Sequence, residues 1–195
     1  MFLQAVRADR HYQGQIAHVE RLPGRPALYG SLEQPLAEPL PAILAGLGIE
    51  RLYSHQARAI ELGREGHDTV IVTSTASGKT LCHNLPVLED LLAAPQRRAL
   101  YLYPTKALAQ DQHRALRRLV DADLDLARRI KSGVYDGDTP QAARRKLRDE
   151  GLILLSNPDV LHSGILPYHT RWARFWANLG TVVIDEVHTY RGIFG

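Results

Sequence analysis

The stretch that decides the fold is TVIVTSTASGKT, residues 69–80. Its first half is apolar and β-branched, its second half is small and polar, and leucines at helical spacing follow it. This pattern predicts a strand over residues 69–75, a loop, and a helix over residues 79–92. In that context, successive backbone N–H groups and a helix N-terminus face an anion. The stretch therefore predicts a phosphate-binding loop.

The chemistry expected of this loop is that of a nucleoside triphosphate site. Lys79 supplies a compact positive charge, and the hydroxyl of Thr80 is a ligand for Mg²⁺. The residues expected to bind ATP here are Thr75, Ala76, Ser77, Gly78, Lys79 and Thr80. The general pattern begins with glycine, and Thr73 stands in that place. A turn rich in serine and threonine that caps a helix is the alternative for this segment taken alone.

A second decisive stretch, TVVIDEVH at residues 181–188, is an apolar strand that ends in two adjacent carboxylates. Strand alternation sends Asp185 and Glu186 to opposite sides, but at a strand end both can reach the phosphates. Asp185 is expected to hold Mg²⁺, and Glu186 to orient and deprotonate the attacking water. A pair of helix-capping acids is the alternative.

Between these two stretches, short apolar runs alternate with longer amphipathic ones. The predicted strands are 69–75, 99–103, 132–135, 152–155 and 181–185, and the predicted helices are 79–92, 106–119, 141–149 and 171–179. Such alternation predicts an α/β fold, a parallel sheet with helices on both faces and ligands at the carboxyl ends of the strands. Residues 1–45, punctuated by proline and glycine, are predicted to be an irregular extension that packs on or leads into a domain over residues 46–195.

Composition adds limits. The chain has 195 residues, 45% of them hydrophobic, a net charge of +3 and a single cysteine, Cys82. No apolar run is long enough to span a bilayer, and no secretory signal is visible. A lone cysteine excludes an internal disulfide, and no Cys/His cluster offers a zinc site. We therefore expect a cytoplasmic globular protein without membrane contact.

The ordered motifs resemble the first RecA-like domain of a superfamily 2 helicase. Residues 73–80 match motif I, and Asp-Glu-Val-His at 185–188 matches the DExH form of motif II. More narrowly, TSTASGKTLCHNLPVLE, YPTKALAQDQ, YDGDTP, SNPDVLH and VVIDEVHTYRGIFG resemble the YprA/MrfA type of bacterial DNA helicase. In that group Thr73 and Ala76 are the expected loop residues.

The resemblance also implies further site residues. LYSHQ at residues 52–56 matches the Q motif, so Gln56 is expected to bond the adenine edge and Tyr53 to line the base pocket. Four residues are expected to contact a nucleic-acid backbone, namely Thr105, Lys106, Gly133 and Asn157. For Thr105 and Asn157, simple helix capping is the alternative. His188 is expected to relay the nucleotide state to a second domain.

As a function, the resemblance implies ATP- and Mg²⁺-dependent 3′-to-5′ translocation on single-stranded DNA, with a role in repair. Motif III and the second RecA-like domain, with its arginine finger, are not in this sequence, so slow or no hydrolysis is expected of the chain alone. Two alternatives stay open: a fragment that binds nucleotide and nucleic acid without turnover, and a P-loop enzyme unrelated to nucleic acid.

Overall fold

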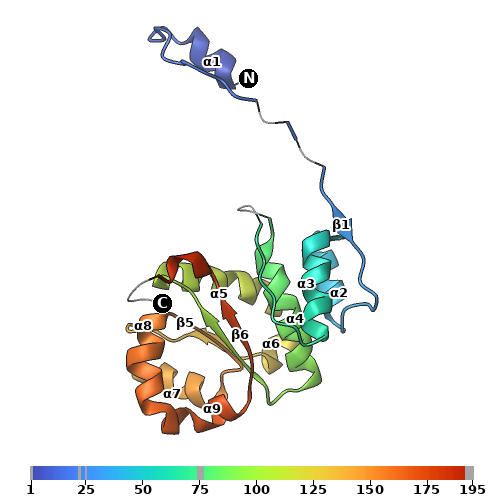
Figure 1. The fold of residues 1–195 in the computed structure, drawn as a ribbon, viewed down its shortest axis with the longest axis vertical. Helices are drawn as coiled ribbons and strands as arrows, with labels where there is room; N and C mark the ends of the chain where they lie inside the picture. Colours follow the sequence, from blue (N-terminus) through green and yellow to red (C-terminus); the bar gives the residue numbers. More distant parts are fainter. Residues whose placement is uncertain (1, 22, 25, 74–76, 192–195) are drawn as a thin grey trace.

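The computed structural model describes residues 2–21, 23–24, 26–73 and 77–191 (Figure 1). The first elements in chain order are α1 (Phe2–Ala8), β1 (Tyr29–Gly30), α2 (Leu40–Gly46), β2 (Leu52–Tyr53), α3 (Ser54–Arg64), α4 (Lys79–Ala93), β3 (Arg98–Leu102), α5 (Lys106–Val120) and α6 (Leu124–Arg129). Then come β4 (Ser132–Val134), α7 (Gln141–Glu150), β5 (Ile153–Ser156), α8 (Pro158–Val160), η1 (Leu161–Ile165), η2 (Leu166–Trp172), α9 (Ala173–Ala177), β6 (Leu179–Ile184) and η3 (Val187–Thr189).

The main sheet has the strand order β4-β5-β3-β6, and every pair in it is parallel. Leu102, the last residue of β3, lies beside Ser156 of β5 and Ile184 of β6. The carboxyl ends of these strands therefore meet at one edge, where the segments that follow them come together.

Two apolar clusters cover the two faces of this sheet. In β3, Ala99 and Tyr101 belong to a cluster with α4 and α5, whereas Leu100 and Leu102 belong to a second one with Trp172 and Phe175. This alternation is the period of two along a strand. The predicted α/β fold, with a parallel sheet covered on both faces, is confirmed.

The predicted strand over residues 69–75 is not formed in the part of it that the structure describes. Residues 67–73 belong to no sheet, and the side chains of Val70 and Val72 are 81% and 90% exposed. Among the described strands β6 pairs with β3 alone, and Val182 and Ile184 of β6 are about half exposed. An apolar run becomes a strand only beside a partner, and the described residues supply none.

The helix predicted over residues 171–179 is shorter than expected. A 3₁₀ helix runs to Trp172, α9 covers Ala173–Ala177, and Leu179 already pairs with Arg98 in the sheet. Strand pairing therefore takes the last residues that the periodicity had assigned to the helix.

The predicted extension packs on the domain from Tyr29 onward. Here β1 pairs antiparallel with β2, and Leu40, Ile43 and Leu44 of α2 belong to the larger apolar cluster. Helix α1, in contrast, buries no residue and lies away from the rest of the chain (Figure 1). The division near residue 45 stays a prediction.

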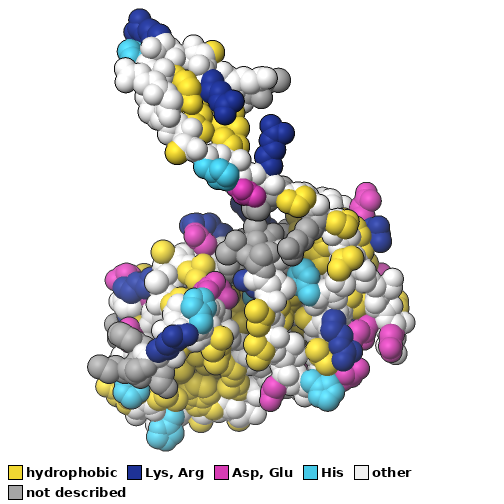
Figure 2. Space-filling model, turned by 45° about the horizontal axis from the view of Figure 1, so that its top comes forward, with side chains coloured by type: hydrophobic (Ala, Val, Ile, Leu, Met, Phe, Trp, Pro, Cys, Tyr) yellow, Lys and Arg dark blue, Asp and Glu magenta, His cyan; other side chains and the backbone are white. Residues whose placement is uncertain are grey.

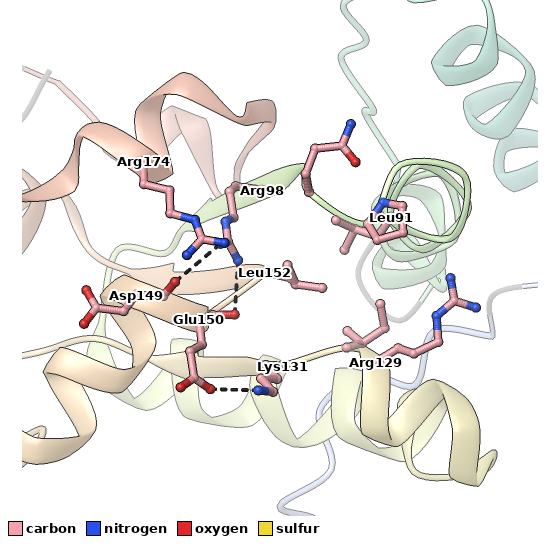
Figure 3. A pocket seen from close by; sticks show the side chains of 11 residues that line it. Leu91, Arg98, Arg129, Lys131, Asp149, Glu150, Leu152 and Arg174 are labelled. Atoms are coloured by element: carbon pink, nitrogen blue, oxygen red, sulfur yellow. Dashed lines mark hydrogen bonds and ion pairs between the residues drawn. The ribbon is translucent and has the colours of Figure 1, made fainter.

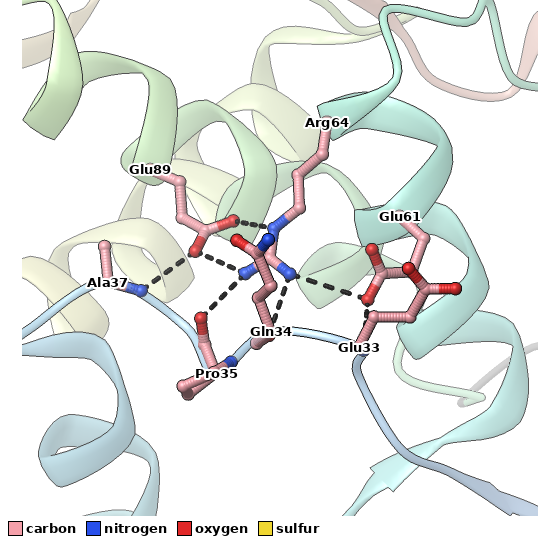
Figure 4. A network of polar contacts seen from close by, with 7 residues as sticks. All are labelled: Glu33, Gln34, Pro35, Ala37, Glu61, Arg64 and Glu89. Atoms are coloured by element: carbon pink, nitrogen blue, oxygen red, sulfur yellow. Dashed lines mark hydrogen bonds and ion pairs between the residues drawn. The ribbon is translucent and has the colours of Figure 1, made fainter.

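Arg64 ties this extension to the helices that flank the phosphate loop (Figure 4). Its guanidinium donates to the carbonyls of Gln34 at 2.8 Å and Pro35 at 3.0 Å, and to both carboxylate oxygens of Glu89 on α4. Glu89 in turn accepts from the N–H of Ala37 at 2.9 Å. One side chain of α3 thus joins the loop at residues 34–37 to α4.

Replacing Arg64 by alanine is expected to destabilise the fold by roughly 2–3 kcal/mol, because the change leaves two carbonyls and a carboxylate without their donor. Only 24% of the Arg64 side chain is exposed, so water replaces the lost bonds poorly. Urea denaturation measures the effect, with Arg58→Ala, an exposed arginine of the same helix, as the control. Equal stabilities of the two variants would contradict this role.

Candidate nucleotide-binding site

The phosphate loop leads into α4, as the sequence predicts. Gly78 precedes the helix with a left-handed φ of 77°, which glycine adopts without strain. Across the loop, the hydroxyls of Thr73 and Ser77 lie 2.6 Å apart, and the Lys79 ammonium donates to the Thr73 carbonyl at 3.3 Å. Thr75 and Ala76, also predicted to bind ATP, lie outside the described residues. Ser77 and Lys79, on either side of Gly78, thus contact Thr73 at the other described end of the loop.

Gln56 of the predicted Q motif clamps the end of this loop. Its side chain, 2% exposed, accepts from the N–H of Tyr53 at 2.9 Å and donates to the Gly78 carbonyl at 3.0 Å. A Cβ added at Gly78 would lie 2.5 Å from the Gln56 amide nitrogen, so this close approach requires glycine. The structure gives Gln56 a role in loop geometry, while its contact with adenine stays a prediction.

An aromatic stack borders the same loop. The ring of Tyr53 stacks on Tyr29 with centroids 5.5 Å apart and on His55 with centroids 5.7 Å apart. His55 also bonds the Ser77 carbonyl at 2.9 Å, and Arg51 lies 4.0 Å from the Tyr29 ring centroid. Tyr53 is 37% exposed, and its place in a base pocket stays a prediction. Sequence reasoning missed Tyr29 and His55, because only strand pairing brings Tyr29 here.

The acidic box follows β6 directly. The Asp185 N–H donates to the Leu102 carbonyl at 3.0 Å, which continues the ladder by one residue. Glu186 then adopts a left-handed conformation with φ of 49°, the one positive φ among the described non-glycine residues. Its N–H donates to an Asp185 carboxylate oxygen at 3.0 Å. The ladder thus holds Asp185 and the turn places Glu186, and such backbone strain is typical of functional sites.

His188, predicted to couple the site to a second domain, lies beside the acidic box. Its Nδ1 is 3.3 Å from a carboxylate oxygen of Glu186, and its side chain is 67% exposed. The contact links His188 to the proposed catalytic base and leaves the ring open to solvent.

The oxygen donors of the site fit Mg²⁺. The Thr80 hydroxyl donates to the side-chain oxygen of Gln112 at 3.2 Å, and Asp185 makes no ion pair with any described residue. Mg²⁺ favours one or two protein oxygens, together with water and phosphate oxygens, over a closed protein cage. The described residues (2–21, 23–24, 26–73 and 77–191) contain no group of three or more His, Cys, Asp or Glu side chains that could hold a metal ion.

Behind the site lies a group of buried polar side chains that sequence reasoning missed. His83 on α4 meets the Tyr101 ring edge-on at 5.2 Å, and its Nε2 has no partner among the described residues. The Tyr101 hydroxyl donates to Asn84 at 3.0 Å. Burial, and after it the charge of Asp185, raises the pKa of Tyr103 and raises that of Tyr190 to about 12. All of these groups are therefore neutral at physiological pH.

His83 is expected to make stability depend on pH. Burial lowers its pKa to about 4, against the opposing effect of Asp185. Between this value and the ordinary pKa of about 6.5, the unfolded chain binds a proton that the folded chain excludes. Stability is therefore full above pH 6.5 and falls toward pH 4, by roughly 2 kcal/mol between pH 7.5 and pH 5.

Denaturant melts at these two pH values measure the loss. It is expected to shrink in His83→Phe, which keeps an aromatic ring beside Tyr101, and to persist in the control His67→Asn, whose imidazole is 63% exposed. An unchanged pH dependence in His83→Phe would contradict the assignment.

The loops predicted to contact nucleic acid follow β3, β4 and β5 at the same sheet edge. The Thr105 hydroxyl accepts from the N–H of Leu108 at 3.2 Å, and the Asn157 side chain accepts from the N–H of Val160 at 2.9 Å. Both residues are therefore helix N-caps, and any contact with a phosphate would add to that role. Lys106 pairs with Asp138 at 2.8 Å, and chiefly this hydrogen bond raises the Lys106 pKa.

Gly133 requires a correction. It is buried in β4, and a Cβ there would lie 2.5 Å from a methyl carbon of Leu147, so this glycine lets α7 pack on the sheet. The exposed glycine of the region is Gly137, in the next loop. The sequence predicted a strand over residues 132–135 that contains Gly133, whereas the glycine of the loop motif YDGDTP is Gly137.

Lys and Arg side chains are spread over the face seen in Figure 2 rather than gathered in one patch. A patch of one sign would attract a polyanion from a distance. Any nucleic-acid contact on this face therefore depends on individual residues at the sheet edge.

A separate cavity of about 330 Å³ opens at the opposite edge, where the strands begin (Figure 3). It is lined by basic residues that already bond helix ends. Arg98 donates to the carbonyls of Glu150 at 3.1 Å and Gly151 at 2.7 Å, and Lys131 pairs with Glu150 at 2.7 Å. These cations stabilise helix C-termini, and the cavity lies away from the phosphate loop.

The comparisons with known proteins agree with this geometry. The DEAD/DEAH box helicase family matches residues 53–195, and the chain belongs to that family. It is 50% identical over 164 residues to the uncharacterized ATP-dependent helicase YprA of Bacillus subtilis, covering 84% of this chain and 22% of YprA. It is 38% identical over 193 residues to the ATP-dependent helicase HRQ1 of Saccharomyces cerevisiae, covering 99% of this chain and 18% of HRQ1.

A solved structure is similar as well. The DUF1998 helicase MrfA bound to DNA and AMPPNP aligns with a TM-score of 0.82 and 49% identity, over 88% of this chain and 24% of that one. The predicted resemblance to the YprA/MrfA type is thereby confirmed. The chain spans less than a quarter of the length of these relatives. No helix in the described part of the chain is long and apolar enough to cross a membrane.

Proposed function

We propose that this chain is the ATP-binding half of an ATP-dependent DNA helicase that tracks 3′ to 5′ along single-stranded DNA and acts in DNA repair in the cytoplasm. The observation that carries this proposal is that the acidic box, which follows β6, lies at the same sheet edge as the loops that follow β3, β4 and β5. Two of these loops lead into helix N-caps, Thr105 and Asn157, and the third contains Gly137. Similarity to MrfA, whose structure holds DNA and AMPPNP, supports both ligands.

In the proposed site each residue has one task. Lys79 and the N–H groups at the start of α4 bind the β- and γ-phosphates. Thr80 and Asp185 hold Mg²⁺, which when bound neutralises phosphate charge. Glu186 orients the attacking water and takes its proton, and His188, in contact with Glu186, passes the nucleotide state onward.

We further propose that the motor is incomplete in this chain, with residues 46–195 as its first domain. Support comes from the exposed valines of residues 67–73 and from the half-exposed apolar side chains of β6, which suit burial by additional polypeptide. The small share of its relatives' length that this chain covers, 22% for YprA, agrees with this proposal. A second RecA-like domain would supply the arginine that stabilises charge on the γ-phosphate.

Calorimetry with ATP and Mg²⁺ and hydrolysis with and without single-stranded DNA test the proposal together. We expect ATP binding, binding of single-stranded DNA and very slow turnover. Absence of ATP binding would refute the proposal. Binding of both ligands with no DNA-stimulated turnover, even when the polypeptide that follows this domain in its relatives is attached, would favour the second candidate, a nucleotide- and nucleic-acid-binding fragment without unwinding activity.

A further inference from the structure

The segment Tyr135–Thr139, here called the β4 loop, is built around the buried side chain of Asp136. One carboxylate oxygen of Asp136 accepts from the Asp138 N–H and from the Thr139 hydroxyl, each at 2.9 Å. The Thr139 hydroxyl also reaches the Val134 carbonyl at 3.0 Å. Asp136 is 5% exposed, so these bonds fix the loop firmly.

Arg144 of α7 holds this loop from behind. One of its guanidinium nitrogens donates to the carbonyls of Asp136 at 2.8 Å and Gly137 at 2.6 Å. Its guanidinium carbon lies 5.6 Å from the ring centroid of Tyr135. The neighbouring Arg145 is 81% exposed and approaches only Asp149, at 3.8 Å. Arg144 thus serves the β4 loop, and Arg145 does not.

The bonds from Arg144 decide where the loop's N–H groups point. In a planar trans peptide, the C=O of one residue and the N–H of the next point in opposite directions. Because the Asp136 carbonyl faces Arg144, the N–H of Gly137 faces away from it. This N–H has no partner among the described residues.

Lys106 lies beside the same residue, Gly137. A Cβ built on Gly137 would be 3.5 Å from the Lys106 ammonium nitrogen. Lys106 is also the first residue of α5, a helix of 15 residues, so it lies at the N-terminus of that helix. A backbone N–H, an ammonium and a helix N-terminus are the donors that proteins direct at phosphates.

We propose that Arg144 is a positioning residue for nucleic-acid binding, which turns the Gly137 N–H outward so that it and Lys106 together hold one phosphate of a DNA strand. The inference rests on the proposed function and extends it to a residue outside the contacting loops. Arg144 itself touches no nucleic acid.

The Asp138 carboxylate pairs with Lys106 where the phosphate is proposed to bind. This carboxylate lies 2.8 Å from the Lys106 ammonium, with the two side chains 81% and 49% exposed, respectively. An ion pair this exposed is weak and exchanges readily. A phosphate of the DNA strand replaces the carboxylate, bringing the same charge to the same cation.

Fluorescence anisotropy with a labelled single-stranded oligonucleotide tests the role of Arg144. Arg144→Ala is expected to weaken binding on the order of 10-fold and to reduce the slope of log affinity against log salt by about 0.7, the value for one phosphate. Arg145→Ala removes the same charge one residue away and is expected to change affinity less than about 2-fold. Arg144→Lys is expected to restore little, because the lysine ammonium ends one atom short of the guanidinium nitrogen that donates to both carbonyls and lacks the planar group that faces Tyr135.

Nucleotide affinity and melting temperature separate positioning from general damage. Nucleotide affinity is expected to stay near wild type in Arg144→Ala, since α7 lies on the opposite face of the sheet from α4. The melting temperature is expected to fall by a few degrees, because two carbonyls lose their donor, but the variant is expected to remain folded at the assay temperature. Equal losses in Arg144→Ala and Arg145→Ala, or full recovery in Arg144→Lys, would overturn the inference and leave the proposed function intact. A wild-type chain that binds no single-stranded DNA would overturn both.

Should Arg144→Ala fold poorly, Asp138→Asn tests the same proposed phosphate site at Gly137 and Lys106. We expect about 3- to 5-fold tighter DNA binding, because the phosphate no longer competes with a carboxylate. The matched control is Glu150→Gln, which removes a carboxylate from the similarly exposed pair with Lys131 at the opposite sheet edge. The gain is expected to vanish in Lys106→Ala. A gain that persists there, or that Glu150→Gln equals, would overturn the inference.

Discussion

Turnover of ATP by this chain is expected to rise by about 10³–10⁵-fold when the polypeptide that follows it in its relatives is joined to it, because an arginine finger contributes a factor of this size. Among the described residues at the phosphate loop, Lys79 contacts the loop itself, and Arg51, beside the bordering aromatic stack, lies over the Tyr29 ring. Steady-state hydrolysis with single-stranded DNA, compared between the chain and its extended form, measures the effect.

The control for this comparison is a pair of affinities. Both forms are expected to bind a non-hydrolysable ATP analogue with similar strength, because the binding groups lie in the shared chain. Rapid DNA-stimulated hydrolysis by the shorter chain would show that no second domain is needed and would refute the proposal of an incomplete motor.

The second large effect concerns the roles of Lys79 and Glu186. In the extended protein, Glu186→Gln is expected to lower hydrolysis by about 10²–10⁴-fold, the range for loss of a general base, while ATP affinity stays within a few-fold. Lys79→Ala is expected to lose both affinity and turnover, because the lysine contacts phosphates in the ground state as well. Calorimetry and hydrolysis on the same preparations separate the two patterns.

His188→Ala is a useful companion to these variants. It removes the group 3.3 Å from the Glu186 carboxylate without removing the base. Hydrolysis that falls as far as in Glu186→Gln would mean that the base depends wholly on His188. Glu186→Gln with wild-type turnover would remove Glu186 from the catalytic role.

The link between the extension and the site follows from packing rather than from motif. Tyr29 reaches the stack with Tyr53 through the pairing of β1 with β2, and Arg64 joins the loop at residues 34–37 to α4. Both contacts act on α3 and α4, the helices that bear Gln56 and Lys79. The extension therefore stabilises the framework on which the phosphate loop is mounted.

Much of this protein could be predicted from its sequence, for a physical reason. The β3 and β5 strands are buried at every position and have near-continuous apolar runs, Ala99–Leu102 and Ile153–Leu155, because a parallel strand between helices is buried on both faces. The phosphate loop and acidic box depend on local order along the chain, which a sequence records directly. The loop and the helix after it place Lys79 at a helix N-terminus, although the strand predicted before them is not formed in the described residues.

Other features were decided by the tertiary structure, because they depend on what lies beside a segment. Residues 69–73 have a strand's composition but no partner in the described residues, and Gly133 is a packing glycine only because Leu147 lies over it. The left-handed turn at Glu186 and the hold of Arg144 on the β4 loop arise from contacts between distant segments. Composition and spacing determine which chemistry the chain carries, whereas side-chain packing and backbone hydrogen bonds across the fold determine where that chemistry points.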